Sequence, residues 1–202
     1  MPERRGTGGE GKTGPRPDRR RFFLAGLSKA LDAFSDIASQ VYPISIPLIR
    51  QVIRPPGALN EQDFQRTCYR CGSCVDACGP GALRLLQSSD EAVSGTPFVD
   101  PDLQACELCE GLPCTKACPS GALARIRREK VRMGLASWSD RRCLRTTGQE
   151  CRACVDKCPI GLEAIRFGPQ GRVEIVSAGC VGCGGCQQVC PARPKAIRVQ
   201  PL

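Results

Sequence analysis

Sixteen cysteines in a chain of 202 residues form four runs, and their spacing indicates their chemistry. The runs are Cys68/Cys71/Cys74/Cys78, Cys106/Cys109/Cys114/Cys118, Cys143/Cys151/Cys154/Cys158 and Cys180/Cys183/Cys186/Cys190. The first and last read C-x2-C-x2-C-x3-C, in which three thiolates hold one [4Fe-4S] cube and the fourth reaches a neighbouring cube. The middle two contain insertions, which lengthen a loop without removing a ligand. Sixteen thiolates therefore predict four [4Fe-4S] cubes.

The pairing of the motifs is predicted from their insertions. The outer two motifs share the compact spacing and the inner two carry the insertions, so we pair motif one with four and two with three. This pairing predicts two nested two-cluster modules. The expected ligand sets are Cys68, Cys71, Cys74 with Cys190; Cys180, Cys183, Cys186 with Cys78; Cys106, Cys109, Cys114 with Cys158; and Cys143, Cys151, Cys154 with Cys118. Sequential pairing, one with two and three with four, is the alternative.

Two other uses of abundant cysteine fit the spacing less well. Disulfide frameworks do not require groups of four at these intervals, and zinc ribbons carry two pairs separated by a long loop. The chain has no histidine, which excludes His-containing zinc fingers, Rieske centres and His-based acid-base catalysis. With every thiolate committed to a cube, the sequence predicts an electron carrier without a catalytic site.

The formal net charge of +9 by itself suggests an acidic partner or nucleic acid. Each oxidised cube with its four thiolates adds about −2, so four cubes offset about −8 of that charge. The loaded protein is then close to neutral, and no nucleic-acid partner is expected.

The N-terminal segment has a different composition from the rest. Residues 1–21 are rich in Gly, Pro and Arg and are expected to be disordered. Within them, Gly6 to Thr13 matches the P-loop pattern, but no strand precedes it, so no nucleotide is expected. Residues 19–53 contain Arg20 and Arg21 before Phe22-Phe23-Leu24, which is typical of a twin-arginine export signal. The alternatives are an uncleaved amphipathic docking helix and an ordinary core helix.

Residues 54–202 form the predicted four-cluster region, built as a fourfold repeat. Each repeat should contain a cysteine loop, one helical turn carrying the last cysteine, and a short strand. The expected strands include residues 82–87, 173–177 and 196–200. Only 4% of the chain is aromatic, so the cubes must supply stabilisation that a hydrophobic core would otherwise give. The predicted fold class is α+β, small and loop-rich.

With these motifs in place, the chain resembles the NapG/MauM-type ferredoxin-type proteins over about residues 54–202. The resemblance rests on the x7 gap of the third motif and on several short segments. They are Arg54-Pro-Pro-Gly-Ala-Leu, Cys71-Gly-x-Cys-Val-x-Ala-Cys, Gly95-Thr-Pro-Phe, Cys106-Glu-x-Cys-Glu, Pro113-Cys-x-Lys-Ala-Cys-Pro-Ser-Gly-Ala-Leu, Arg132-Met-Gly-Leu-Ala and Cys180-x-Gly-Cys-Gly-x-Cys.

The resemblance implies a non-catalytic carrier with four [4Fe-4S] clusters, exported to the periplasmic side of the inner membrane by the twin-arginine route. Its implied partners are a membrane-bound ferredoxin-type or quinol-oxidising protein and a periplasmic redox protein or oxidoreductase. The alternatives are a cytoplasmic, membrane-associated polyferredoxin subunit and a structural zinc module.

Overall fold

A computed structural model describes residues 52–202, which belong to one compact unit. The predictions for residues 1–21 and for the leader up to residue 51 lie outside the described residues. No helix within residues 52–202 has the length and hydropathy needed to cross a membrane.

Four helical turns of four residues each carry the cysteine motifs, and a longer helix, α2, precedes them. They are α2 (Glu61–Thr67), α3 (Ser73–Asp76), α4 (Pro113–Lys116), α5 (Ala153–Asp156) and α6 (Gly185–Gln188). Each short turn contains the third cysteine of its motif, not the fourth as predicted. The fourth follows the turn, and in motifs one, three and four its N–H donates back to the turn, as in Cys78 N to Val75 O at 3.0 Å. Each turn ends two residues before the fourth cysteine, which therefore lies outside the helix.

Three two-stranded antiparallel sheets connect the motifs. Their strands are β1 (Leu83–Leu85) with β2 (Pro97–Val99), β3 (Gly134–Trp138) with β6 (Ile197–Pro201), and β4 (Ile165–Phe167) with β5 (Val173–Ile175). The predicted strands at residues 82–87, 173–177 and 196–200 are confirmed as β1, β5 and β6. Five short 3-10 turns lie between them, at Arg128–Lys130, Asp140–Arg142, Leu144–Thr147, Gly161–Glu163 and Pro169–Gly171. The small, loop-rich α+β class is therefore confirmed.

Arg54 anchors the segment that leads into the first motif. Its Nη1 donates to Thr96 Oγ1 and to the Pro97 carbonyl, each at 2.9 Å, and its Nε donates to Glu61 at 2.8 Å. The guanidinium also lies 4.7 Å from the centre of the fully buried Phe64 ring. Burial raises the pKa of Glu61, but the hydrogen bonds from Arg54 and Gln65 and the charge of Arg54 together outweigh it and hold that pKa below its usual value. These contacts fix α2 beside the first motif.

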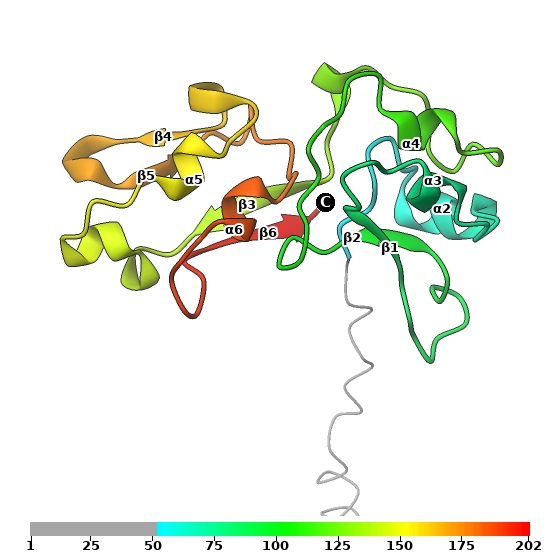
Figure 1. The fold of residues 1–202 in the computed structure, drawn as a ribbon, viewed down its shortest axis with the longest axis horizontal. Coiled ribbons are helices and arrows are strands. Elements are labelled where there is room, and N and C mark those ends of the chain that lie inside the picture. The colour runs from blue at the N-terminus through cyan, green and yellow to red at the C-terminus, as the bar shows by residue number, and fades with distance from the viewer. Residues whose placement is uncertain (1–51) are drawn as a thin grey trace, which may run out of the picture. The chain divides into compact units, whose positions relative to one another are not determined.

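Two hydrophobic clusters lie around the cysteines. The first contains Phe64, Leu108 and Leu112, and the second contains Ile165 and Ile197. Figure 1 shows the elements of the first two motifs to the right and those of the last two to the left.

The segment Val181–Cys183 of the fourth motif connects these two halves. Val181 and Cys183 belong to the first hydrophobic cluster, in which they pack with residues of motifs one and two. The Val181 carbonyl accepts from Met133 N at 2.9 Å, and the Cys183 carbonyl accepts from Cys106 N at 2.9 Å. Between them, Gly182 has a left-handed φ of +73°. A Cβ there would lie 2.3 Å from Gly134 N, so no larger residue fits.

Gly182→Ala should therefore destabilise the protein by about 3–5 kcal/mol, combining a strained left-handed alanine with a backbone clash. For a chain of this size that corresponds to a fall of roughly 10 °C in the thermal midpoint. Gly148→Ala is the matched control, because Gly148 is exposed and has a φ of +87° but no atom within 4 Å of the added Cβ. It should lose only about 1 kcal/mol, roughly 3 °C. The thermal midpoint of cluster bleaching measures both, and equal losses would contradict this interpretation.

Candidate iron–sulfur sites

All sixteen cysteines line four cavities, and each cavity has four of them. Site 1 has Cys68, Cys71, Cys74 and Cys118; site 2 has Cys78, Cys106, Cys109 and Cys114; site 3 has Cys158, Cys180, Cys183 and Cys186; site 4 has Cys143, Cys151, Cys154 and Cys190. Each cavity contains about 310–360 Å³ of space between the atoms, solvent at its mouth included. In every site three cysteines come from one motif and one from its neighbour along the chain.

These sets correct the predicted nested pairing. Cys118, not Cys190, lies with Cys68, and Cys190, not Cys118, lies with Cys143. Likewise Cys114 lies with Cys78, whereas the prediction placed Cys158 in that set. Motif one therefore exchanges its last cysteine with motif two, and motif three with motif four, as in the alternative pairing. The predicted insertion of one module into the other is wrong for the same reason.

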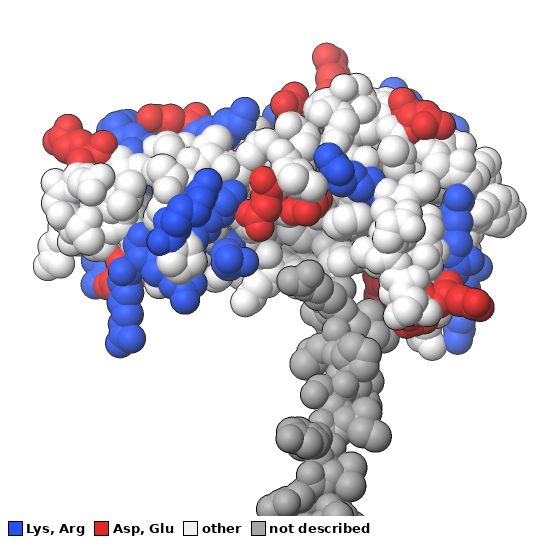
Figure 2. All heavy atoms as spheres, turned by 60° about the horizontal axis from the view of Figure 1, so that its bottom comes forward, with Lys and Arg blue, Asp and Glu red and all other residues white. Residues whose placement is uncertain are grey.

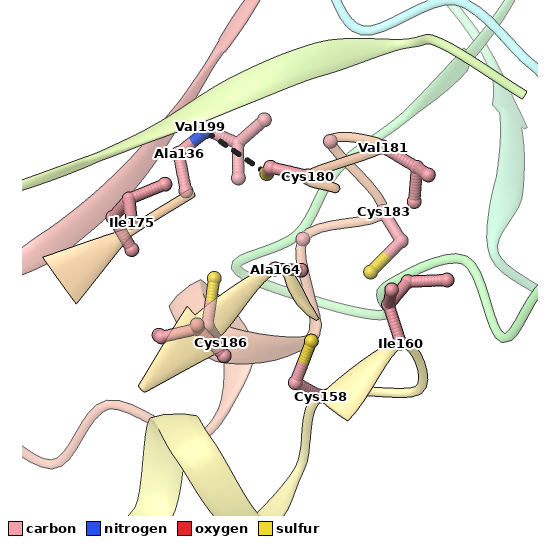
Figure 3. A pocket seen from close by; sticks show the side chains of 13 residues that line it. Ala136, Cys158, Ile160, Ala164, Ile175, Cys180, Val181, Cys183, Cys186 and Val199 are labelled. Carbon is pink, nitrogen blue, oxygen red and sulfur yellow. Dashed lines mark hydrogen bonds between the residues drawn. The ribbon is translucent and has the colours of Figure 1, made fainter. Parts of the chain in front are cut away.

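The thiols of site 3 point toward a shared space. Figure 3 shows the sulfur atoms of Cys158, Cys180, Cys183 and Cys186 converging from different segments of the chain. The dashed line marks the Ala136 N–H, which donates to Cys180 Sγ at 3.5 Å. Because Ala136 lies on β3, this bond connects the third site to the β3–β6 sheet.

Backbone N–H groups donate to sulfur in every site, and sequence reasoning missed most of these donors. Three further bonds reach a last cysteine: Ala82 N to Cys78 at 3.3 Å, Leu123 N to Cys118 at 3.4 Å, and Ala196 N to Cys190 at 3.4 Å. In the first motif, Arg70 N donates to Cys68 Sγ at 3.4 Å. Such donors stabilise negative charge on the ligands and so raise the reduction potential of a cluster.

A left-handed residue directly before the second cysteine of a motif helps to aim these donors. It is Arg70 in motif one with φ 55°, Leu108 in motif two with φ 52°, and Gly182 in motif four. The Arg70 side chain compensates for the strain, because its Nε donates to Ser94 O at 3.0 Å and its Nη2 to Ala92 O at 2.8 Å. A non-glycine residue at such a position was not predictable from spacing.

Two serines also lie beside thiols. Ser73 Oγ is 3.3 Å from Cys71 Sγ, and Ser120 Oγ is 3.5 Å from Cys118 Sγ. The hydrogen bond to Ser73 lowers the pKa of the Cys71 thiol, and for Cys118 the bonds to Ser120 and to backbone N–H groups outweigh burial and lower its pKa. Each serine follows its cysteine by two residues, which is the sequence signal that was overlooked.

More deeply buried thiols have raised pKa values. Burial raises the pKa of Cys74 and of Cys106 to about 12, and that of Cys114 and Cys154 to about 11. Neighbouring thiols raise these pKa values further. Cys68 and Cys118, which lie in site 1 with Cys74, both raise the pKa of Cys74. Without metal these four thiols are therefore protonated at neutral pH, and iron must displace their protons when it binds.

The donor set fits a cluster of several atoms better than a single ion. A single zinc needs its thiolates at about 2.3 Å from the metal, which holds the sulfurs close to one another. Within residues 52–202, no three His, Cys, Asp or Glu side chains lie close enough together to hold one metal ion. The thiols instead surround a space lined mainly by apolar residues, with Tyr69, Arg70 and Ser120 at site 1 and Glu107 at site 2 as polar exceptions, and N–H groups donate to their sulfurs. That arrangement suits an iron–sulfur cube with its own sulfide atoms.

The four sites follow one another in a row. Sites 1 and 2 share the first two motifs, and sites 3 and 4 share the last two. Between sites 2 and 3, Cys106 N donates to the Cys183 carbonyl, and the Cys183 thiol contributes to the raised pKa of Cys106. Between sites 3 and 4, the Cys154 thiol contributes to the raised pKa of Cys186. The order along the row is therefore site 1, 2, 3 and 4.

Charge is distributed unevenly along this row. Residues 52–131 contain nine Lys or Arg and ten Asp or Glu, whereas residues 132–202 contain eleven and five. Figure 2 shows the corresponding concentration of blue atoms over the part formed by the last two motifs. Arg141, Arg142 and Arg193 are exposed and lie close in sequence to the site 4 ligands Cys143 and Cys190. The half of the described chain that contains site 4 is therefore the basic half.

Paired cysteine motifs that exchange their last ligands define an iron–sulfur protein of the dicluster ferredoxin type. The family profile described as the 4Fe-4S dicluster domain matches residues 67–122 and 147–193. Each match covers one sequential pair of motifs, in agreement with the four sites. Cys143 precedes the second match, yet it lies in site 4 with Cys151, Cys154 and Cys190.

Known relatives identify the family more narrowly. The chain is 43% identical over 206 residues to the methylamine utilization ferredoxin-type protein MauM of Paracoccus denitrificans, covering 94% of this chain and 90% of that protein. It is also 43% identical over 164 residues to the ferredoxin-type protein NapG of Escherichia coli, covering 74% and 71% respectively. The chain belongs to the NapG/MauM family of ferredoxin-type proteins, as its motifs predicted. Membership implies [4Fe-4S] clusters and electron transfer.

Pairs of cysteine substitutions distinguish the two pairings. Cys68→Ala with Cys118→Ala removes two ligands from one site, so iron should fall by about four atoms per chain, one cube. Cys68→Ala with Cys190→Ala removes ligands from two sites, so iron should fall by about eight. Iron analysis of anaerobically purified variants measures both. The nested pairing requires the reverse result, with the larger loss in the Cys68/Cys118 variant.

Proposed function

We propose that this protein is an electron carrier with four [4Fe-4S] clusters and no catalytic site of its own. The observation that carries the proposal is the division of sixteen cysteines into four cavities of four, with none left over. A cube with four thiolate ligands has no iron open to substrate. When bound, each cluster takes up and passes on one electron.

The protein's own residues would hold the clusters and adjust their potentials. The cysteines provide the ligands, and the N–H groups at Cys68, Cys78, Cys118 and Cys190 stabilise the charge on sulfur. Apolar side chains around each cavity exclude water, which lowers the local dielectric. The contact between Cys106 and Cys183 keeps sites 2 and 3 adjacent. The row of sites thus supports transfer from one end of the molecule to the other.

We place the protein between a membrane-bound, quinol-linked ferredoxin-type partner and a periplasmic redox protein or oxidoreductase. The relatives' names support a ferredoxin-type carrier, in one case within methylamine utilization, and the two partners are proposed from the resemblance to the NapG/MauM family. The ends of the row suit two different partners, because the first half of the described chain is nearly neutral and the second half is basic. Four bound cubes make the first half negative and leave the second half positive, given about −2 for each cube.

We also propose export by the twin-arginine route, on the support of Arg20-Arg21-Phe22-Phe23-Leu24. This route carries folded, cofactor-loaded proteins, and the clusters must be assembled before export because they hold the fold together.

Metal analysis and spectroscopy test the carrier. Anaerobically purified protein should contain about sixteen iron and sixteen sulfide per chain, because each cube holds four of each. Reduction with dithionite should give electron paramagnetic resonance signals of spin-coupled [4Fe-4S]⁺ clusters. Zinc without sulfide, or iron near eight with half the cysteines free, would contradict the proposal.

The location is tested with a fusion of residues 1–60 to a reporter that is active only after export. The natural segment should export the reporter, and Arg20→Lys with Arg21→Lys should abolish export, because the pathway requires both arginines. Arg4→Lys with Arg5→Lys is the matched control and should leave export unchanged. Reporter retained inside the cell with the natural segment would favour the cytoplasmic alternative.

A further inference from the structure

Trp138 has a buried indole N–H for which the described residues offer no acceptor. Its Nε1 is the only buried side-chain nitrogen or oxygen within residues 52–202 that lacks a hydrogen-bond partner. An indole N–H is a donor only, and buried tryptophans normally find an acceptor. An unpaired buried donor destabilises the fold, because nothing replaces the hydrogen bond that it makes to water when exposed. The chain contains one tryptophan, so the residue is unique in this protein.

The position of Trp138 points to the acceptor. Trp138 ends β3, where it pairs with Ile197 of β6, and it lines site 4 together with the four site 4 cysteines. Side chains alternate along a strand, so Trp138 shares a face with Ala136, two residues earlier. Ala136 lines site 3 and donates its N–H to Cys180 Sγ. One face of β3 therefore serves two neighbouring sites.

The rest of the cavity leaves sulfur as the available acceptor. Apart from Trp138 and its four thiols, site 4 is lined by Leu144, Val173, Pro191, Ala192, Ala196 and Ile197. None of these has a polar side chain. A water molecule needs two to four polar partners, which this lining does not offer. The Arg172 guanidinium lies 5.5 Å from the ring centre and is itself paired with Asp140, and it accepts no hydrogen bond.

We propose that the Trp138 indole N–H donates a hydrogen bond to a sulfur of the cluster at site 4, either a cysteine thiolate or a sulfide. The inference rests on the proposed function, because it requires a cluster in that site. A hydrogen bond to sulfur stabilises the more negative, reduced state, so it raises the reduction potential of that cluster. Trp138 is thus a positioning and tuning residue for the terminal site of the row.

Site-specific labelling tests the hydrogen bond without any substitution. Growth with ¹⁵N-indole-labelled tryptophan places the label at one position of the chain. Electron–nuclear double resonance of the reduced holoprotein should show ¹⁵N hyperfine coupling and an exchangeable proton coupled to a cluster. If the protein holds about sixteen irons but its signals show no ¹⁵N coupling, this inference is wrong while the proposed function stands. If the protein holds no cubes, the proposed function itself fails.

An isosteric replacement tests the effect on the potential. Substitution of Trp138 by 3-benzothienylalanine replaces the indole N–H with sulfur and keeps the shape of the ring. Redox titration should show one of the four cluster potentials shifted to a more negative value and the other three unchanged. Trp138→Phe provides a second variant with the same expected direction. A shift of all four potentials indicates a general structural effect and overturns the inference, as does no shift at all.

Discussion

The last cysteine of each motif lies with the first three cysteines of the neighbouring motif, and the rest of the structure depends on this exchange. The helices and strands are too short to be stable alone: the turns that carry the motifs have four residues, and the strands have three to five. A cluster bound by four thiolates joins two such motifs and contributes its binding free energy to folding. The exchange therefore allows a chain with few aromatic residues to hold a defined fold.

A second constraint joins the two pairs. The segment Val181–Cys183 belongs to the fourth motif, yet it forms backbone hydrogen bonds with Met133 and with Cys106. Gly182 permits that close approach because it has no side chain. The same contact that completes the packing also brings site 2 beside site 3, so the stability of the interface and the continuity of the row have one cause. A chain with two independent halves would lack this continuity.

Sequence reasoning predicted the sixteen cysteines that line the four cavities, and the fold class, because both depend on local spacing. The strand at residues 196–200 was predictable from the alternation in Ile197-Arg-Val, and Cys143 was predictable from the ligand count. The pairing was not, because the length of an insertion between cysteines does not tell which motif the last cysteine reaches. The prediction also placed the helical turn on the fourth cysteine of each motif, because the spacing of cysteines does not show where a short helix ends. The donors Ala82, Leu123 and Ala136 carry no side-chain signal at all, and their role depends entirely on how the backbone folds back to sulfur.

The central claim is that four clusters lie in a row, each held by three cysteines of one motif and one of the neighbouring motif. Anomalous diffraction at the iron absorption edge, from crystals of the anaerobic holoprotein, measures this directly. The account predicts four separate iron groups, with Cys118 bound to the first, Cys78 to the second, Cys158 to the third and Cys190 to the fourth. Fewer than four groups, or Cys190 bound with Cys68, would contradict it.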